Sequence, residues 1–493
     1  MIMTQEQAIL KGQRQFGEMA TFVQQAARDG RPIEQVERGL WESLLTLGRT
    51  MLESYVGAQS PGDLGPSVTV KGRSLRRLQE LHERRYVSVF GELTISRAVY
   101  GTRATQKHEV VPLDARLGLP EGDFSHLLQE WDQAFCVQGS YDASRHTVAR
   151  VLGLGQSVRS LEQMNVAMAR AVESFRDAQP TPLVEEEGSL LVLTADGKGI
   201  PMRRKQDERP AGRRRKKGGK ANKKRMACVG AAYTIEPFRR TADEVVDEVL
   251  RKQCRAARPR PAHKRMRAEL TREIEGVEVN GKERIFSWFA EQVGARNPDG
   301  NKPVVCVMDG ERALWKRLKE SVPQVVCILD LFHVLERLWQ AAHCFHAEGS
   351  VAAQEFVTDR LRRLLLGEVG YVIGGLKQMA TKHKLRGARK RQLLTAVGYL
   401  QRNRGMMRYD EYLAAGYPIG SGVAEGACRH LVKDRMELTG MRWRTVGAQA
   451  MLDLRAVYLN DDWDAFQKSR VKQERRRLYP YLRIVRQHWR AAA

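Results

Sequence analysis

The sequence predicts an α/β protein preceded by a mostly helical amino-terminal region that carries a β-hairpin. Two observations indicate this division. Up to about residue 176 the apolar residues recur mainly at helical spacing, whereas after residue 185 short apolar runs typical of buried strands alternate with helical segments. The expected strands are 189–195, 226–235, 303–308 and 324–329, and the expected helices among them are 279–294 and 311–321.

Length and composition limit the class of protein. A chain of 493 residues with 42% apolar residues is long enough for two to four folded domains. No run approaches the 18 apolar residues of a membrane span, and the amino terminus does not resemble a signal peptide. The seven cysteines form no CxxC pair, so neither a disulfide framework nor a zinc knuckle is expected. These features predict a cytoplasmic protein without a membrane partner.

The amino-terminal region is expected to contain helices, one hairpin and short linkers. Residues 86–100 alternate apolar and polar side chains on both sides of Gly91-Glu92, which is a hairpin pattern. The helical stretches 124–153 and 157–175 are separated by GLGQS and form either a helix-turn-helix or an ordinary helix pair. The other expected elements are two helices within 4–57 joined near 29–32, a linker at 57–68 and a boundary at 177–188.

Positive charge is concentrated in two blocks. The net charge is +25, yet residues 1–150 hold 18 basic and 18 acidic side chains. Residues 203–225 carry a net charge of +11 and are expected to form a long loop between two paired strands. Residues 468–490 carry +8 and are expected to form a basic tail. Such blocks are either solvated surface or binding sites for a polyanion, and two of them favour nucleic acid.

Three carboxylates stand where a metal site can form. Asp196 and Asp309 each end an apolar strand and precede a glycine, and Glu425 lies in the first turns of a helix expected to be capped by Ser421. The carboxyl ends of neighbouring strands meet at one edge of an α/β sheet. Carboxylates that converge there repel one another unless a divalent cation lies between them, and oxygen ligands suit Mg²⁺ or Mn²⁺.

Each of these residues also has an ordinary structural interpretation. A single aspartate at a strand end is commonly a turn former or helix cap, and Glu425 alone would be a helix-surface residue. Asp330 also ends a strand, so the residues alone leave open which of Asp309 and Asp330 is the second ligand. The combination of three carboxylates with a strongly basic chain favours phosphoryl transfer on nucleic acid.

Five segments, in order, resemble the motifs of DDE transposases, and most closely the Kra-type insertion-sequence family of the Mutator-like superfamily. The segments are ADGKG (195–199), VMDGERALW (307–315), DLFHVLERLW (330–339), GSGVAEGACRHLVKDRM (420–436) and TGMRW (439–443). VPLDARLGLP (111–120) resembles a phrase in that family's amino-terminal region. The resemblance implies an RNase H-like catalytic domain with a long all-helical insertion before the glutamate, two Mg²⁺ (or Mn²⁺) ions, no organic cofactor, and cleavage and joining of DNA at transposon ends.

The resemblance also implies roles for individual residues. Asp196, Asp309 and Glu425 would be the catalytic, metal-binding triad, and Asp330 with His333 would match a DxxH element that supports the site or contacts DNA. A histidine held in the core by Asp330 is the structural alternative for His333. DNA contacts are expected from Lys198, Arg429, Lys433, Arg435, Arg442 and Trp443, and from Arg213, Arg214, Arg215, Lys216 and Lys217 of the basic loop. Core packing is an equally good interpretation of Trp443, and a solvated side chain is the ordinary interpretation of Lys198. Pairing with Asp434 and Glu437 is the alternative for some of Arg429, Lys433 and Arg435.

The resulting expectation is a DNA transposase that binds terminal inverted repeats and target DNA, acts as a homodimer or larger assembly, and is associated with the bacterial nucleoid. Another RNase H-like nuclease and a catalytically silent DNA-binding derivative remain as alternatives. The expected parts are an end-binding and multimerisation region (1–176), a first catalytic segment (185–346), a helical insertion (347–415), a second catalytic segment (416–460) and the basic tail (461–493).

Overall fold

The computed structural model describes residues 5–101, 109–203, 224–250 and 257–492. The chain forms two compact units, which are considered separately: unit 1 comprises residues 1–177 and 462–493, and unit 2 comprises residues 178–461. The division at residue 177 lies beside the expected boundary at 177–188. No helix of the described residues has both the length and the apolar composition needed to cross a bilayer.

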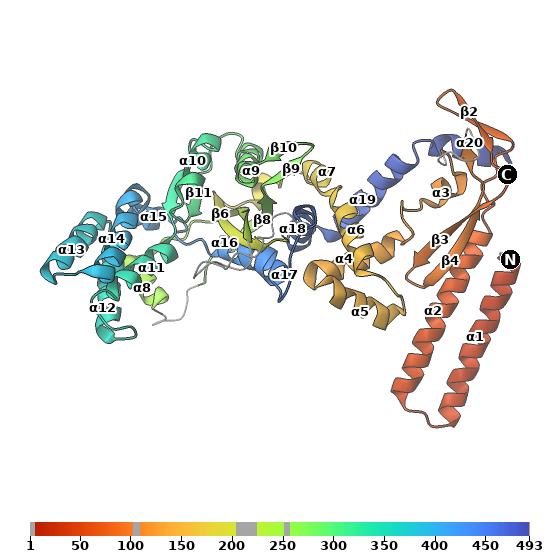
Figure 1. Ribbon diagram of the computed structural model, residues 1–493, viewed down its shortest axis with the longest axis horizontal. Helices are drawn as coiled ribbons and strands as arrows, with labels where there is room; N and C mark the ends of the chain where they lie inside the picture. Colours follow the sequence, from red (N-terminus) through yellow and green to blue (C-terminus); the bar gives the residue numbers. More distant parts are fainter. Residues whose placement is uncertain (1–4, 102–108, 204–223, 251–256, 493) are drawn as a thin grey trace, which may run out of the picture. The chain divides into compact units, whose positions relative to one another are not determined.

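Unit 1 begins with a long antiparallel helix pair, α1 and α2, joined at Asp29–Pro32 as the sequence predicts (Figure 1). The predicted hairpin is also present, although its turn is at Val89-Phe90, two positions before Gly91-Glu92. The expected single helical stretch 124–153 is wrong, because Gly139 ends one helix and the Ser140 side chain caps the next by accepting from Ala143 N–H. The elements before residue 178 are α1 (Gln5–Arg28), α2 (Ile33–Gly57), β1 (Ser67–Val70), β2 (Arg73–Arg77), β3 (His82–Ser88), β4 (Gly91–Arg97), β5 (Tyr100–Gly101), α3 (Pro112–Leu117), α4 (His126–Gln138), α5 (Tyr141–Leu152), α6 (Val158–Ala169) and α7 (Val172–Asp177).

The carboxyl-terminal residues are not a tail. They form α19 (Trp463–Leu478) and α20 (Leu482–Ala492), and both helices belong to unit 1. Tyr481 and Val485 are buried in a core shared with β1, β2 and β5, and the Tyr481 hydroxyl accepts a hydrogen bond from Val111 N–H. The apolar residues among the basic ones, which the charge count conceals, therefore fix this segment in the fold.

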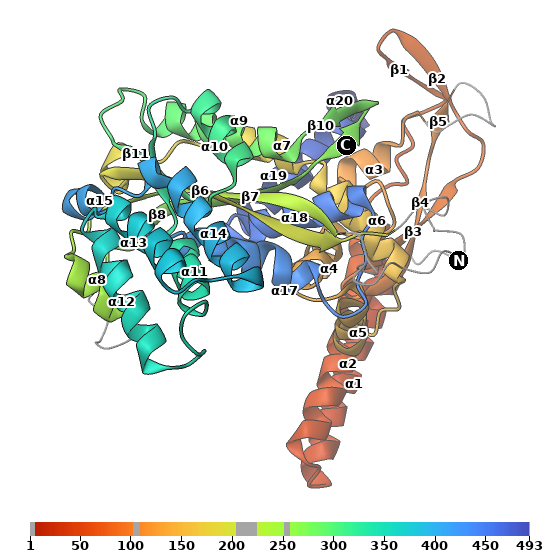
Figure 2. The ribbon, with the colours of Figure 1, turned by 60° about the vertical axis from the view of Figure 1, so that its left-hand side comes forward.

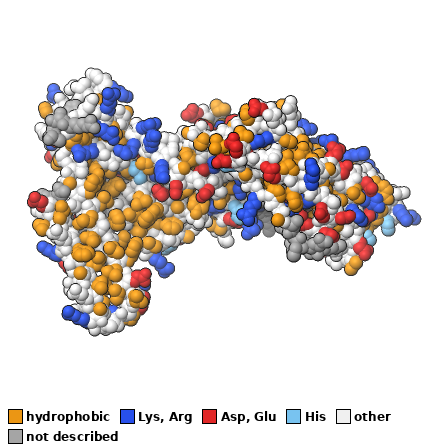
Figure 3. All heavy atoms as spheres, turned by 180° about the vertical axis from the view of Figure 1, so that it is seen from behind, with side chains coloured by type: hydrophobic (Ala, Val, Ile, Leu, Met, Phe, Trp, Pro, Cys, Tyr) orange, Lys and Arg blue, Asp and Glu red, His pale blue; other side chains and the backbone are white. Residues whose placement is uncertain are grey.

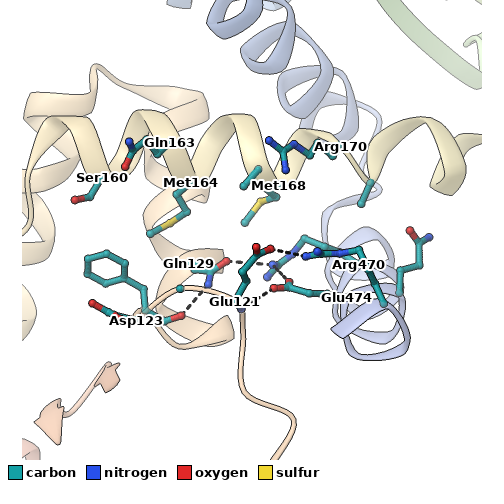
Figure 4. Close-up of a pocket in the computed structure, with 16 residues that line it drawn as sticks. Glu121, Asp123, Gln129, Ser160, Gln163, Met164, Met168, Arg170, Arg470 and Glu474 are labelled. Carbon is teal, nitrogen blue, oxygen red and sulfur yellow. Dashed lines mark hydrogen bonds and ion pairs between the residues drawn. The ribbon is translucent and has the colours of Figure 1, made fainter. Parts of the chain in front are cut away.

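Arg470 connects α19 to the helices of unit 1. Its side chain is buried, and its guanidinium donates to Gln467, Gln129 and Glu474 over 2.9, 3.2 and 3.3 Å. Burial lowers the pKa of Arg470, while the nearby carboxylates of Glu474 and Glu130 favour the charged form. Figure 4 shows this group on the wall of a hollow of about 800 Å³ between α6, α19 and the segment 121–124.

Unit 2 is built on a five-stranded mixed sheet with the order β12-β11-β6-β7-β8. Strands β6, β11 and β12 run parallel, and β6, β7 and β8 are joined antiparallel. The chain is therefore α/β as the sequence predicts. The bounds of the strands are β6 (Leu190–Pro201), β7 (Lys224–Ile235), β8 (Ala262–Leu270), β9 (Arg272–Ile274), β10 (Val277–Val279), β11 (Val304–Met308) and β12 (Val326–Leu329).

Strand β8 was not predicted. Its sequence, AHKRMRAEL, carries charged side chains that hide the apolar pattern, but Arg267 is buried and pairs with the buried Glu269 over 2.9 Å. The expected long loop 203–225 begins and ends as a hairpin, because β6 and β7 pair as far as Pro201 and Lys224. The loop residues 204–223, including Arg213, Arg214, Arg215, Lys216 and Lys217, lie outside the described residues.

Helices cover both faces of the sheet. Alternate strand residues such as Leu191 and Cys306 pack against α9 and α10, and the residues between them, such as Val305 and Val307, pack against the helices of the insertion. In Figure 2, α9 and α10 lie above the sheet, and α11 and α14 lie below it. The helices are η1 (Val184–Glu186), α8 (Ala242–Val249), α9 (Gly281–Arg296), α10 (Arg312–Ser321), α11 (Leu331–Ala342), α12 (Val351–Leu365), α13 (Val369–Lys382), α14 (Gly387–Arg402), η3 (Arg404–Met406), α15 (Tyr409–Ala415), α16 (Gly422–Ala427), η4 (Cys428–Lys433), α17 (Asp434–Met436) and α18 (Thr445–Leu459). The segment 347–415 is all-helical in its regular structure, as expected.

Candidate functional site

Strand register brings the three strand aspartates to one edge of the sheet. Ala195 pairs with Met308 in the parallel β6–β11 register, and Met308 pairs with Leu329 in β11–β12. The next residue on each strand is Asp196, Asp309 and Asp330. Asp309 and Asp330 directly follow their strands, whereas Asp196 lies within β6, which continues to Pro201 because it remains paired with β7. The expectation that Asp196 ends a strand is therefore wrong, but its place at the edge of the parallel part of the sheet stands.

The side chain of Asp309 is held by the turn that follows it. One carboxylate oxygen accepts from Glu311 N–H over 3.0 Å, and the Asp309 carbonyl accepts from the Trp315 indole N–H over 2.6 Å. Burial raises the pKa of Asp309, and the negative charge of Asp196 raises it further. These two carboxylates are therefore close enough to repel each other.

Gly310 makes room for protein rather than for a substrate. A Cβ at this position would lie 2.5 Å from the Tyr399 ring and 2.7 Å from the Asn403 amide nitrogen. Both residues lie at the C-terminal end of α14, within the helical insertion. The glycine after Asp309 thus lets the insertion pack directly against the aspartate turn.

Asp330 is fully buried and both of its oxygens are engaged. Oδ1 accepts from Ser421 N–H over 2.8 Å, and Oδ2 lies 2.6 Å from His333 Nδ1 and 3.3 Å from the His333 backbone nitrogen. Asp330 therefore caps α11 and fastens the start of the glutamate-bearing segment to it. Ser421 stands before α16 as expected, but its side chain makes no capping hydrogen bond.

His333 is positively charged at neutral pH. The hydrogen bond to Asp330 raises the pKa of His333 to about 9, and the charges of Asp330, Asp309 and Glu336 add to this effect. Its side chain is 30% exposed, so it is not enclosed in the core. Its charge also favours the ionised forms of Asp309 and Glu425.

Glu425 lies on α16 and is exposed. Partial burial raises the pKa of its carboxyl, and the negative charges of Asp330 and Asp196 raise it further, while His333 opposes them. The helix then widens into a π-helical segment, η4, whose carbonyls at His430 and Leu431 accept hydrogen bonds from the buried Arg455. Local π-helical geometry of this kind is frequent beside functional groups.

Cys428 is a site residue that the sequence analysis missed. Its thiol lies 3.4 Å from Asp196 Oδ2 as a hydrogen-bond donor, and burial together with the Asp196 charge raises its pKa. Its spacing of three residues from Glu425 places both on one helix face, and that spacing is the signal that could have identified it.

The carboxylate oxygens of the site suit a hard divalent cation, although the side chains do not converge on one point that could hold it. Among the described residues, no three His, Cys, Asp or Glu side chains are near enough to hold a metal ion as they stand. Asp196, Asp309 and Glu425 nevertheless present carboxylate oxygens, and the charge of Asp196 raises the pKa of both Asp309 and Glu425, a repulsion that a bound cation would relieve. Because Glu425 is exposed, its rotamer can change without disturbing the core.

The expected DNA-binding residues divide into two groups. Lys198 is half-buried on β6, two residues from Asp196 and on the same strand face, and Arg429, Lys433 and Arg442 are exposed. Arg435 is fully buried, with its guanidinium over the Trp443 ring at 5.1 Å.

Two of the expected DNA contacts are therefore corrected. Trp443 is also buried, and its indole N–H donates to the Met436 carbonyl over 3.1 Å. Neither Arg435 nor Trp443 is available to DNA in this conformation.

Neither a scan against protein-family models nor a search of curated proteins finds a match for this chain.

Manganese binding provides a test of the site that does not depend on activity. We expect MnCl₂ to raise the melting temperature of the wild-type protein, because a cation bound only by the folded state adds about 2.7 kcal/mol at a concentration 100 times its dissociation constant. Asp309→Asn should lose most of this shift without destabilising the metal-free protein, since it removes a partly buried charge that Asp196 repels. Differential scanning fluorimetry measures both effects. Asp299→Asn, at an exposed position, is the matched control, and an equal shift in Asp309→Asn would remove Asp309 from the ligand set.

The charge of His333 can be measured directly. NMR titration of the histidine ring protons should give a pKa of about 9 for His333, assigned by loss of its signal in His333→Gln. Asp330→Asn should bring this pKa down toward the ordinary value of about 6.5. Since the folded-state pKa is raised, the stability from the pair is complete below about pH 6.5 and is lost as the pH rises through about 9. A His333 pKa near 6.5 in the wild type would contradict the pairing.

Proposed function

We propose that this chain is a DNA transposase of the DDE type, with Asp196, Asp309 and Glu425 as its catalytic triad. The observation that carries the proposal is the alignment of Asp196 and Asp309 on neighbouring parallel strands, with Glu425 on a helix within electrostatic reach of Asp196. The sheet order β12-β11-β6-β7-β8, with the three consecutive strands β6, β7 and β8 antiparallel, supports an RNase H-like catalytic unit. The all-helical segment before Glu425 supports the same assignment.

In this proposal the strand aspartates Asp196 and Asp309 bind divalent cations, and Glu425 completes the ligand set from an exposed position on its helix. Divalent cations held by these three carboxylates would supply the charge that activates a water, or a DNA 3′-hydroxyl, and stabilises the leaving oxygen of a phosphodiester. His333, held in its charged form by Asp330, adds a positive group beside carboxylates that face polyanionic DNA. Asp330 acts as a positioning residue, because both of its oxygens already accept hydrogen bonds from the protein.

Exposed cations near the carboxylates would hold the DNA backbone. Arg429 and Lys433 follow Glu425 on the same helical segment, and Arg442 lies on the loop that returns to β6. Lys198 is near enough to Cys428, and hence to Asp196, to affect the thiol electrostatically. Basic side chains placed in this way contact phosphates and confer affinity without reading sequence.

Unit 1 offers a separate surface for DNA. A groove of about 670 Å³ on α19 and α20 is lined by five Lys or Arg side chains and no acidic ones: Lys468, Lys472, Arg475, Arg476 and Arg486, with Val471, Tyr479, Pro480 and Leu482. Five cationic side chains with no acidic neighbour in the lining suit a phosphate backbone. The proposed partners are accordingly duplex DNA at the element's ends and at the target.

The triad is tested by Glu425→Gln. The amide keeps the size of the side chain but loses its charge, so the variant should bind DNA normally and cleave at least about 100-fold more slowly. Single-turnover cleavage of duplexes carrying the DNA that flanks the gene measures the rate, and gel shifts without metal measure binding. Glu411→Gln, an exposed glutamate of the insertion, is the control.

The cleavage products also separate the alternatives. Joined products are expected for a transposase, and cleavage without joining would indicate an RNase H-like nuclease. A wild-type protein that binds without cleaving would be a silent derivative. Cleavage by Glu425→Gln at the wild-type rate would remove Glu425 from the triad.

The basic groove is tested by the salt dependence of binding. Replacing Lys472 and Arg476 by Gln should flatten the slope of log K against log salt by about 2, since each phosphate contact contributes about 0.9. Arg38→Gln with Arg150→Gln removes the same charge from exposed positions outside the groove and should leave the slope nearly unchanged. Fluorescence anisotropy with a labelled duplex measures both slopes. Equal slopes for the two double variants would show that the groove does not hold DNA.

A further inference from the structure

The α1–α2 hairpin exposes an unusual amount of apolar surface. Of the 27 large hydrophobic side chains that are exposed in the described part of the chain, nine belong to these two helices. They are Ile9, Leu10, Phe16, Val23, Ile33, Trp41, Leu44, Met51 and Tyr55. Figure 3 shows hydrophobic side chains gathered over this hairpin. Scattered apolar residues need no explanation, but a contiguous face marks an interaction site.

The exposed residues form regular stripes. On α1, Ile9, Phe16 and Val23 recur every seven residues, and Ala20 and Ala27 lie on the same side of the helix. On α2, Leu44 and Met51 are also seven residues apart, and Ile33, Leu40 and Tyr55 continue their side. This is the spacing with which helices pack against further helices.

The two stripes lie on one side of the hairpin. A Cβ at Gly12 of α1 would collide with the end of the Met51 side chain and would lie 3.7 Å from Leu47. Met51 therefore reaches across to α1 while it remains 42% exposed. The apolar stripe of α2 thus continues into that of α1 and forms a single face.

Other sides of the two helices are already in use. Gly39 of α2 packs against Phe22 of α1, which forms the seam of the hairpin. Along the edge of the α2 stripe, the Trp41 indole donates to the Val151 carbonyl over 2.7 Å, and Gly48 packs against Phe90. The hairpin therefore joins the rest of unit 1 along one edge of the apolar face, and the face itself, including Leu44 and Met51, remains exposed.

Charge and size identify the partner. Residues 5–57 carry six Lys or Arg and seven Asp or Glu side chains, so in a chain of net charge +25 this hairpin is nearly neutral. It does not attract DNA or an anionic membrane, and two copies of it do not repel each other. Helices of about 24 residues at a spacing of 8–10 Å present a face of roughly 700 Å², which is close to the roughly 800 Å² per partner of a stable protein interface.

We propose that this face binds the same face of a second copy of the chain, so that two hairpins form a four-helix bundle about a two-fold axis. Phe16 and Leu44, which are 60% and 46% exposed, would be buried at its centre. The inference rests on the surface alone and does not require the proposed function. In a DNA transposase it would bring two catalytic units together.

Sedimentation velocity of the full chain, without DNA or metal, tests this interface. In high salt, which screens surface charge but not apolar contacts, the wild type should sediment as a dimer at micromolar concentration. Phe16→Glu with Leu44→Glu should weaken the dimer by about thirtyfold or more and give a monomer with unchanged circular dichroism. Val351→Glu with Leu394→Glu places the same charges at equally exposed apolar positions outside the hairpin and should leave the dimer intact.

Three results would overturn the interface. They are a monomeric wild type, a dimer that survives both hairpin substitutions, and a monomer that binds neutral phosphatidylcholine vesicles through this face. Phe16→Ala with Leu44→Ala, which introduces no charge, should weaken the dimer to a smaller extent and guards against misfolding of the glutamate variant. DNA cleavage by a monomeric wild type would overturn the interface and leave the proposed function standing.

Discussion

The candidate site of unit 2 depends on one buried carboxylate. Asp330 has no exposed surface, and a buried charge of this kind costs several kcal/mol unless it is paired and fully hydrogen-bonded. Its partners meet this requirement from two directions: His333 from the helix that Asp330 itself caps, and Ser421 N–H from the segment that leads to Glu425. The hydrogen bond from Ser421 N–H to Asp330 thereby joins the end of β12 to the start of the helix that carries Glu425, 91 residues later in the chain.

The helical insertion between these points is part of the site's framework. Its core is continuous with the face of the sheet that carries Val305, Val307 and Ile328. Tyr409 donates from its hydroxyl to the Leu329 carbonyl over 2.8 Å, directly before Asp330. Tyr399 and Asn403 press against Gly310, directly after Asp309. The insertion thus constrains the backbone at both aspartates, and this explains why so long a segment can separate two parts of one site.

The proposed binding surfaces of the chain differ in charge. The hairpin α1–α2 is nearly neutral and apolar on one face, which suits association between proteins. The groove on α19 and α20 has five basic and no acidic lining residues, which suits a polyanion. Both belong to unit 1, although they come from opposite ends of the sequence. Unit 1 therefore combines two surfaces of different chemistry, and unit 2 carries the carboxylates.

The sequence by itself determined the α/β class, the helix pair at 4–57, the all-helical segment 347–415 and the identity of the acidic residues. These features follow from local periodicity and from apolar runs that end on aspartate, and both are properties of neighbouring residues. The pairing of Asp330 with His333 was also predictable, because residues three positions apart at the start of a helix share a face.

Only the tertiary structure decided the rest, because it depends on which side chains the folded chain buries and on contacts between segments. In the sequence, Arg435 and Trp443 resemble surface residues, but the structure buries both. The charge of Arg267 obscures the strand pattern of β8, and its pairing with Glu269 is what allows it to be buried there. Cys428 gains its contact with Asp196 only when a helix from residue 422 onward lies across β6. A charged residue is usually exposed, but burial beside a partner places Arg267 and Arg435 inside the fold, and the local sequence pattern does not encode that burial.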